Sequence, residues 1–317
     1  MGQILTSIHG SLLGLDKNGV LVDKNGNPVG QKINTEGKCV YVSSVTGAAN
    51  ANGLSPDQAV TTLALAFDLV TANQGDMIVL LPDHQETLGT GAVALDIAGV
   101  YVLGLGKGDH QPQFNMNHAA AEISITANDI TLDNIRFSAD VTTVAVAIEI
   151  EDGVDYTTIR NCKFDVVTTG TDEFTAAIHL INDNTGTVIE NNYFSQGLAA
   201  AVAAIHMDAD TDNTQILNNR IEGDYSTACI VGDTTLSTKL LIKGNLLMNG
   251  IPSNIGTEPG IELLTGTEAI IADNYIVCNL ATKAAAIVAD TALLFENYYN
   301  EDITGTGGLI GTVSADD

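Results

Sequence analysis

The stretch LDNIRF at residues 132–137 introduces the six-residue phrase that decides the fold. The phrase is an apolar residue, any residue, Asn or a close substitute, any two residues and, in nearly every copy, a second apolar residue. Six further copies follow: IRNCKF (159–164), IENNYF (189–194), ILNNRI (216–221), IKGNLL (242–247), IADNYI (271–276) and FENYYN (295–300). Their starts are 27, 30, 27, 26, 29 and 24 residues apart. This near-constant period indicates a solenoid in which each copy belongs to one coil.

The third position of the phrase predicts a tight bend, because Asn, Asp and Gly tolerate a left-handed backbone. The residues beside the apolar ends, such as Arg160 and Lys163, are mostly polar, which is the period-two pattern of strands. Each coil is therefore predicted to contain a strand, a loop, a second strand, the bend, a third strand and a return loop. The apolar positions of the first strands are Ile148, Ile178, Ile205, Ile230, Ile261 and Ile287.

Coils of this kind stack so that equivalent strands pair in parallel and equivalent side chains form ladders. We predict an Asn ladder from the third position of the phrase: Asn134, Asn161, Asn191, Asn218, Asp273 and Asn297. A helical repeat is disfavoured, because β-branched residues dominate the apolar positions and Asn interrupts the coils. The predicted fold class is all-β, a single-stranded right-handed parallel β-helix of about 7–9 coils.

The segment before the repeat predicts a capping helix. Ser55-Pro56-Asp57-Gln58 has the pattern of a capping box with Pro at the first helical position, and apolar residues at helical spacing follow. The run MIVLLP (77–82) then predicts a buried strand. A helix ahead of the first strand would cover the open end of the stack, as terminal repeats must.

The same segment carries a resemblance to a known family. The stretches GLSPDQAVTTLALAFDLV (53–70) and GDMIVLLPDHQET (75–87) resemble the entry into the β-helix of the pectate-lyase-like superfamily, and the resemblance extends over residues 38–302. That superfamily contains lyases, hydrolases, adhesins, viral tailspikes and capsid decorations. The resemblance therefore implies the fold but leaves the function open.

The first 38 residues do not share the repeat. LGLDKNGVLVDKNGNPV (13–29) holds two Lys-Asn-Gly turns, and Asn-Gly predicts a β-hairpin, which would be either a lid or an arm that attaches to a capsid, a tail protein or an oligomer partner. The segment SIHGSLLGLDKNGVLVDKNGNPVG (7–30) resembles the opening of bacteriophage structural proteins. The predicted organisation is a hairpin arm (1–38), an entry segment with the capping helix (39–76), the β-helix (77–302) and a tail (303–317).

Composition limits the partners of the chain. Twelve basic and 39 acidic residues give a net charge of −27, and such an acidic surface repels nucleic acid and anionic membranes, which we exclude as partners. No apolar run approaches the ~20 residues of a transmembrane helix. The N-terminus lacks the basic region and the apolar stretch of a signal peptide. A protein made in a host cytoplasm without an export signal, yet with an extracellular type of fold, is typical of a virion component.

One row of side chains has the residue types for chemistry. The outward position of the first strand holds Glu149, His179 and His206 in successive coils, each about 4.8 Å from the next. Two histidines beside a carboxylate can act in acid–base catalysis, bind a metal or sense pH. The alternative, which we favour, is a structural ladder that adjacent coils of similar sequence produce by default. If the chain is an enzyme, these three residues are its catalytic candidates.

Other catalytic arrangements are weakly supported. Glycosidases need two carboxylates ~5–9.5 Å apart, but the acidic pairs Glu151/Asp152 and Asp172/Glu173 fall in predicted loops, with no matching acid expected on the neighbouring coil.

A calcium loop is only half present. Asp208, Asp210 and Asp212 begin like one, but the Gly and Glu that complete the motif are missing. Ca²⁺ is therefore a weak candidate, and no other cofactor is expected.

These observations predict a non-enzymatic viral structural protein, a bacteriophage capsid decoration or spike that stabilises a shell or contacts a host surface. Because viral β-helices are commonly trimers, the resemblance also implies a homotrimer, attached to a capsid or tail protein through residues 1–38. The alternatives are a polysaccharide lyase or hydrolase of the tailspike kind and a carbohydrate-binding adhesin, both with a glycan as the partner.

Overall fold

The computed structural model describes residues 4–8, 11–15, 21–22, 37–168, 171–196, 201–232, 237–251, 254–255, 258–278, 283–300 and 308–310. The chain divides into two compact units, Met1–Glu36 and Gly37–Asp317. The first unit holds three strands that pair antiparallel in the order β1 (Ile4–Ile8), β2 (Ser11–Leu15) and β3 (Leu21–Val22). The two Lys-Asn-Gly turns lie outside the described residues, so the role of this unit as an attachment arm stays a prediction.

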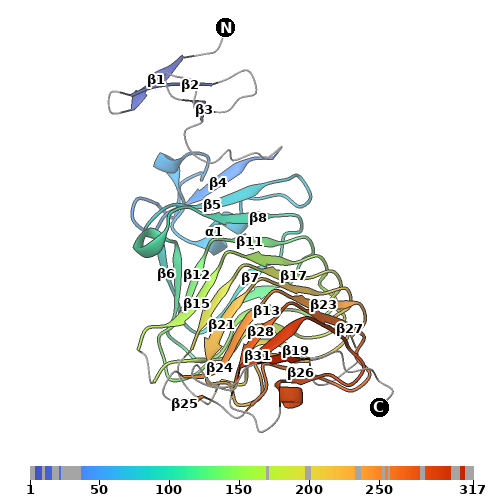
Figure 1. Cartoon of the computed structure of the whole chain (residues 1–317). Coiled ribbons are helices and arrows are strands. Elements are labelled where there is room, and N and C mark those ends of the chain that lie inside the picture. The colour runs from blue at the N-terminus through green and yellow to red at the C-terminus, as the bar shows by residue number, and fades with distance from the viewer. Residues whose placement is uncertain are drawn as a thin grey trace. The chain divides into compact units, whose positions relative to one another are not determined.

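The second unit is a parallel β-helix with three sheets. Its coils follow one another in Figure 1 in the order of the colours from blue to red. Sheet I contains β7 (Gly91–Leu95), β10 (Ala121–Ile125), β13 (Val144–Ile150), β16 (Phe174–Leu180), β19 (Ala203–Met207), β22 (Ile230–Gly232), β26 (Ile261–Leu263) and β29 (Ile287–Val288). Sheet II contains β4 (Cys39–Val42), β5 (Met77–Leu80), β8 (Tyr101–Gly104), β11 (Thr131–Asp133), β14 (Thr158–Arg160), β17 (Val188–Glu190), β20 (Gln215–Leu217), β23 (Leu240–Lys243), β27 (Ala269–Ala272) and β30 (Leu293–Phe295).

Sheet III contains β6 (Gln85–Leu88), β9 (Gln113–Met116), β12 (Arg136–Ala139), β15 (Lys163–Val166), β18 (Tyr193–Ser195), β21 (Arg220–Gly223), β24 (Leu246–Ile251), β28 (Tyr275–Val277), β31 (Asn297–Asn300) and β32 (Gly308–Ile310). A short strand, β25 (Asn254–Ile255), pairs with β24 off this path. Three 3-10 turns, η1 (Pro56–Gln58), η2 (Gly108–His110) and η3 (Lys283–Ala286), and one helix, α1 (Leu63–Phe67), complete the described elements. None of the described helices has the length and apolar character needed to cross a membrane.

The chain visits the sheets in the order I, II, III within each coil, as the coil β13–β14–β15 illustrates. Asn161, with φ 54°, makes the bend between β14 and β15. Strands of the same sheet pair in parallel from coil to coil, apart from β32, which pairs antiparallel with β31. In sheet I, for example, Ile148 lies opposite Ile178. The prediction of an all-β parallel β-helix is therefore confirmed.

Apolar columns fill the interior of the stack. In sheet I the predicted column is continuous and buried: Ile148, Ile178, Ile205, Ile230, Ile261 and Ile287. The structure extends it by one coil, to Ile123. In sheet III the rings of Phe114, Phe137, Phe164 and Phe194 stack with centroids 5.7, 5.1 and 4.7 Å apart. Burial of each such side chain contributes about 1.5–3 kcal/mol, so the columns are a main source of stability.

The Asn ladder lies one residue beyond the predicted one. The bend residues Asn161, Asn191 and Asn218 have positive φ and are exposed, because a left-handed residue at the bend turns its side chain outward. The residue after each bend points inward instead. The buried ladder consists of Asn192, Asn219, Asn245, Asn274 and Asn297.

Of the predicted ladder positions, only Asn297 belongs to the buried ladder; Asn134 and Asp273, like the three exposed residues above, are bend residues with positive φ. The last copy of the phrase is also displaced by one residue, since Leu294 pairs with Ile271 and Tyr299 with Ile276. Glu296, with φ 48°, makes that bend.

The helical part of the entry segment begins later than the capping-box pattern predicts. Residues 56–58 form only η1, for which the Ser55 side chain makes no capping hydrogen bond. Val60 bridges to Val42 of β4 in parallel, so its backbone is committed to sheet pairing. Helix α1 starts after Thr62, whose side chain accepts a hydrogen bond from the Leu65 N–H, and it packs against β4 and β7.

Candidate functional site

Sheet I carries a row of polar side chains on its outward face. Glu149 of β13 pairs in register with His179 of β16, and His179 pairs with His206 of β19. The row begins one coil earlier with Ser124 of β10 and ends at Val231 of β22. The alternation along each strand places the apolar neighbours of these residues inside, which forces the polar ones outward. The structure thus brings the three predicted catalytic candidates into one row.

His179 is the centre of the row. Its Nδ1 lies 3.2 Å from Glu149 Oε2, and its Nε2 lies 3.1 Å from Asp208 Oδ2. The His179 side chain is 17% exposed, so both contacts are made largely out of water. Such shielding strengthens the attraction between an imidazole and a carboxylate.

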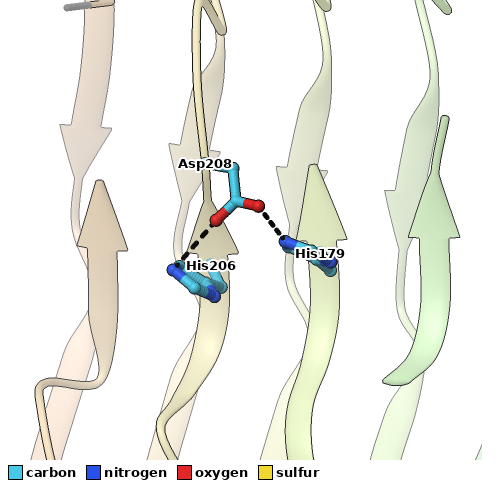
Figure 2. Close-up of side chains that lie close together, drawn as sticks. All are labelled: His179, His206 and Asp208. Carbon is cyan, nitrogen blue, oxygen red and sulfur yellow. Dashed lines mark ion pairs between the residues drawn. The ribbon is translucent and has the colours of Figure 1, made fainter. Parts of the chain in front are cut away.

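Asp208 joins the two histidines, as Figure 2 shows. It follows the end of β19, and its backbone N–H donates to the Leu180 carbonyl at 2.9 Å. Its second carboxylate oxygen, Oδ1, lies 3.4 Å from His206 Nε2. The two imidazole rings stack with centroids 5.1 Å apart and planes inclined by 21°. One ligand atom from each of these three residues falls within 4.8 Å of the others, which is close enough for a shared cation.

Carboxylates gather on the Glu149 side of the row. Glu151 Oε1 accepts a hydrogen bond of 2.7 Å from Ser124 Oγ. Glu122 of β10 is half-buried, and its burial raises the pKa of its carboxyl, with the negative charges of Glu149 and Glu151 as further causes. His179 acts in the opposite direction. Glu122 therefore holds its proton more tightly than an exposed carboxyl would, which is the kind of environment that enzymes use for a general acid.

Glu122 and Ser124 were missed from the sequence, and Glu151 was assigned to a loop without a partner acid. The structure corrects the expectation that no acid on a neighbouring coil faces Glu151. Glu122 of the preceding coil lies close enough to Glu149 and Glu151 for their charges to raise the pKa of the Glu122 carboxyl. The segment AEISI (121–125) does contain an outward acid in a period-two pattern. It lies ahead of the first copy of the phrase, so the repeat gave it no register.

The three aspartates of the incomplete calcium motif, Asp208, Asp210 and Asp212, lie in different surroundings. Asp208 faces the two histidines, whereas Asp212 Oδ1 accepts the Thr238 N–H of the next coil at 2.7 Å. Asp210 is exposed and has a φ of 37°.

Comparison with known proteins adds little to the site. No model of a known protein family matches the chain, and no curated protein matches it in sequence. Its fold is similar to a pectin methylesterase from Aspergillus niger in deglycosylated form, with 12% identity and a TM-score of 0.48, over 89% of this chain and 94% of that one. It is also similar to ORF18 of Geobacillus virus E2, with 10% identity and a TM-score of 0.43, over 95% of this chain and 70% of that one. A lacto-N-biosidase of family GH136 from Eubacterium ramulus shows 10% identity and a TM-score of 0.30, over 84% of this chain and 67% of that one. Similarity at this level assigns no activity.

Proposed function

We propose that this chain is a non-enzymatic structural protein of a virus particle, a bacteriophage capsid decoration or spike. The observation that carries the proposal is the uninterrupted stack of parallel strands, with its buried Asn ladder and its Phe column. The inner strands of each sheet bond to the equivalent strands of both neighbouring coils, as β13 does with β10 and β16, and we expect this to make the stack stiff and resistant to proteases. The resemblance of residues 7–30 to the opening of bacteriophage structural proteins supports the viral setting.

The charged side chains of the β-helix support a role in which the protein does not bind nucleic acid. Several of the few basic side chains are already paired with acids, such as Arg136 with Asp165 at 2.9 Å and Arg160 with Asp133 at 2.9 Å. The excess acidic charge is therefore left to face the solvent. This surface would repel a packaged genome and would keep neighbouring copies soluble.

Assembly into a homotrimer is part of the proposal. The last coils expose large apolar side chains on their outward faces: Ile270, Tyr275, Leu293, Phe295 and Tyr298. Exposed apolar patches of this kind are typical of surfaces that contact other proteins. Light scattering on the purified chain should give three times its mass of 33.0 kDa. A monomer would contradict the trimer without touching the structural role.

Cross-linking on native particles tests the proposal. We expect the chain to copurify with particles, and Lys17, Lys24 and Lys32 of the first unit to cross-link to a capsid or tail protein. Lys107 and Lys239, which belong to the β-helix, are the matched comparison and should give few such links. Absence from purified particles would refute the viral role. Links from the β-helix lysines alone would refute attachment through the first unit.

A carbohydrate-active enzyme is the second candidate, and the cluster of Glu122, Glu149, Glu151 and His179 favours it. A carboxyl whose pKa is raised by burial and by neighbouring carboxylates resembles the general acid of glycoside hydrolases. Incubation with capsular and plant polysaccharides should then release reducing ends or unsaturated products. Glu149→Gln, His179→Ala and His206→Ala should each abolish the release. Glycan binding without any product would instead indicate an adhesin.

A further inference from the structure

We propose that His179, His206 and Asp208 form a binding site for one divalent transition-metal ion, and that Zn²⁺ suits this ligand set. The inference goes beyond the proposed structural role, which requires no metal. It rests on the geometry of the row on sheet I, where two imidazoles and one carboxylate converge. Imidazole nitrogen and carboxylate oxygen are ordinary ligands of Zn²⁺.

The contacts of the two Asp208 oxygens, Oδ2 with His179 and Oδ1 with His206, are close to the spacing of ligand atoms in a coordination sphere. Bonds of ~2.0–2.2 Å in a tetrahedral zinc site place neighbouring ligand atoms ~3.3–3.5 Å apart. The Asp208 oxygens lie 3.1 Å from His179 Nε2 and 3.4 Å from His206 Nε2. An ion between them would replace the protons that these contacts share. Binding would draw the three ligand atoms, which lie within 4.8 Å of one another, closer together.

The scaffold holds the ligands in place. His179 and His206 stand on neighbouring strands in register, and their rings are stacked. Asp208 is tied to β16 by its backbone hydrogen bond to Leu180. Ligands on strands are positioned more accurately than ligands on loops, and this reduces the entropy lost when an ion binds.

Glu149 contacts the ring nitrogen of His179 that faces away from Asp208. Its Oε2 lies 3.2 Å from His179 Nδ1, so it can accept the Nδ1 proton and leave the Nε2 lone pair for the ion. A carboxylate on the far nitrogen of a histidine ligand is the usual orienting contact in zinc sites. The acidic surroundings also compensate the charge of a divalent cation.

The site would keep one position open. The next residue of the row is Val231, which offers no ligand atom, and the Asp208 side chain is 36% exposed. A water molecule can therefore take the fourth position. Three protein ligands and a water are typical of zinc sites that exchange ligands rather than purely structural ones.

Calorimetric titration of the chelator-treated full chain with ZnCl₂ tests the site. We expect one ion per chain, in a background in which Cys39→Ser removes the partly exposed thiol. Glu149→Gln should weaken binding about 10- to 100-fold, and His206→Gln should weaken it further. His110→Gln is the matched control, because His110 also contacts a carboxylate, at 2.7 Å from Asp83, but among the described residues it belongs to no group of three metal-ligating side chains. Equal binding by the His206→Gln and His110→Gln proteins, or no stoichiometric binding by the parent, would overturn the proposal.

X-ray absorption at the zinc edge gives a readout that does not depend on how the variants fold. The loaded parent should show only nitrogen and oxygen neighbours, with the scattering pattern of two imidazoles. Sulfur scattering, or a shell without imidazole, would place the ion elsewhere and refute the assignment. Asp208→Asn, which preserves the side-chain shape but removes the carboxylate charge, should weaken Zn²⁺ binding in the titration.

Discussion

The buried Asn ladder provides the sharpest test of what stabilises the stack. The Asn219 side chain makes four hydrogen bonds: Oδ1 accepts from Asn192 N at 2.9 Å and from Asn192 Nδ2 at 3.1 Å, and Nδ2 donates to Ile189 O at 2.8 Å and to Asn245 Oδ1 at 3.1 Å. Asn219→Ala removes all four and leaves their partners buried. At about 1 kcal/mol for each bond, the free energy of unfolding should fall by about 4 kcal/mol.

Urea denaturation followed by far-ultraviolet circular dichroism measures this loss. The matched control is Asn218→Gly, one residue earlier, because Asn218 is exposed and its φ of 52° suits glycine. The control should change the free energy of unfolding by no more than about 0.5 kcal/mol. If the midpoint of Asn219→Ala coincides with that of Asn218→Gly, the ladder contributes no net stability and the reasoning fails.

Three further predictions concern the interior. Phe164→Ala opens the stacked column and should lower the free energy of unfolding by about 3–5 kcal/mol in the same urea assay; a loss below about 1 kcal/mol would contradict the packing. A thiol reagent near neutral pH should modify Cys39 at most, because Cys162, Cys229 and Cys278 are buried, and should reach all four thiols only in urea. More than one fast-reacting thiol in the folded chain would argue against their burial. Burial raises the pKa of Cys162 and of Cys278 to about 12, from an ordinary value of 9.0. The unfolded chain therefore loses these protons first, so stability should fall as the pH rises from about 9 toward 12, and the double variant Cys162→Ala/Cys278→Ala should flatten that slope of the urea midpoint.

The coil architecture could be predicted because it depends on short-range patterns. Each coil is specified by about 27 consecutive residues. Within them, apolar positions two apart indicate the strands, and residues that accept a left-handed backbone indicate the bend. Stacking repeats this pattern from coil to coil. The inward column through Ile148 and Ile178 and the bend at Asn161 follow directly. Where the phrase contains two adjacent Asn residues, as at Asn191 and Asn192, the sequence does not tell which of the two belongs to the buried ladder. The outward turn of the left-handed residue decides which side chain is buried.

The parallel stack and the row of Glu149, His179 and His206 follow from the amino-acid sequence alone, because strand alternation and a constant period place equivalent residues side by side. The folded structure was needed to show that Asp208 contacts His206 of its own coil and His179 of the preceding one, and that Glu122 lies near Glu149. The backbone of Asp208 keeps the register of the stack by donating to Leu180, but strand alternation does not set the direction of a side chain just past a strand end. Glu122 lies before the first copy of the phrase, where the repeat predicts no register. The positions of these two side chains depend on loop conformation and coil-to-coil packing, which are set by contacts between residues far apart in the chain.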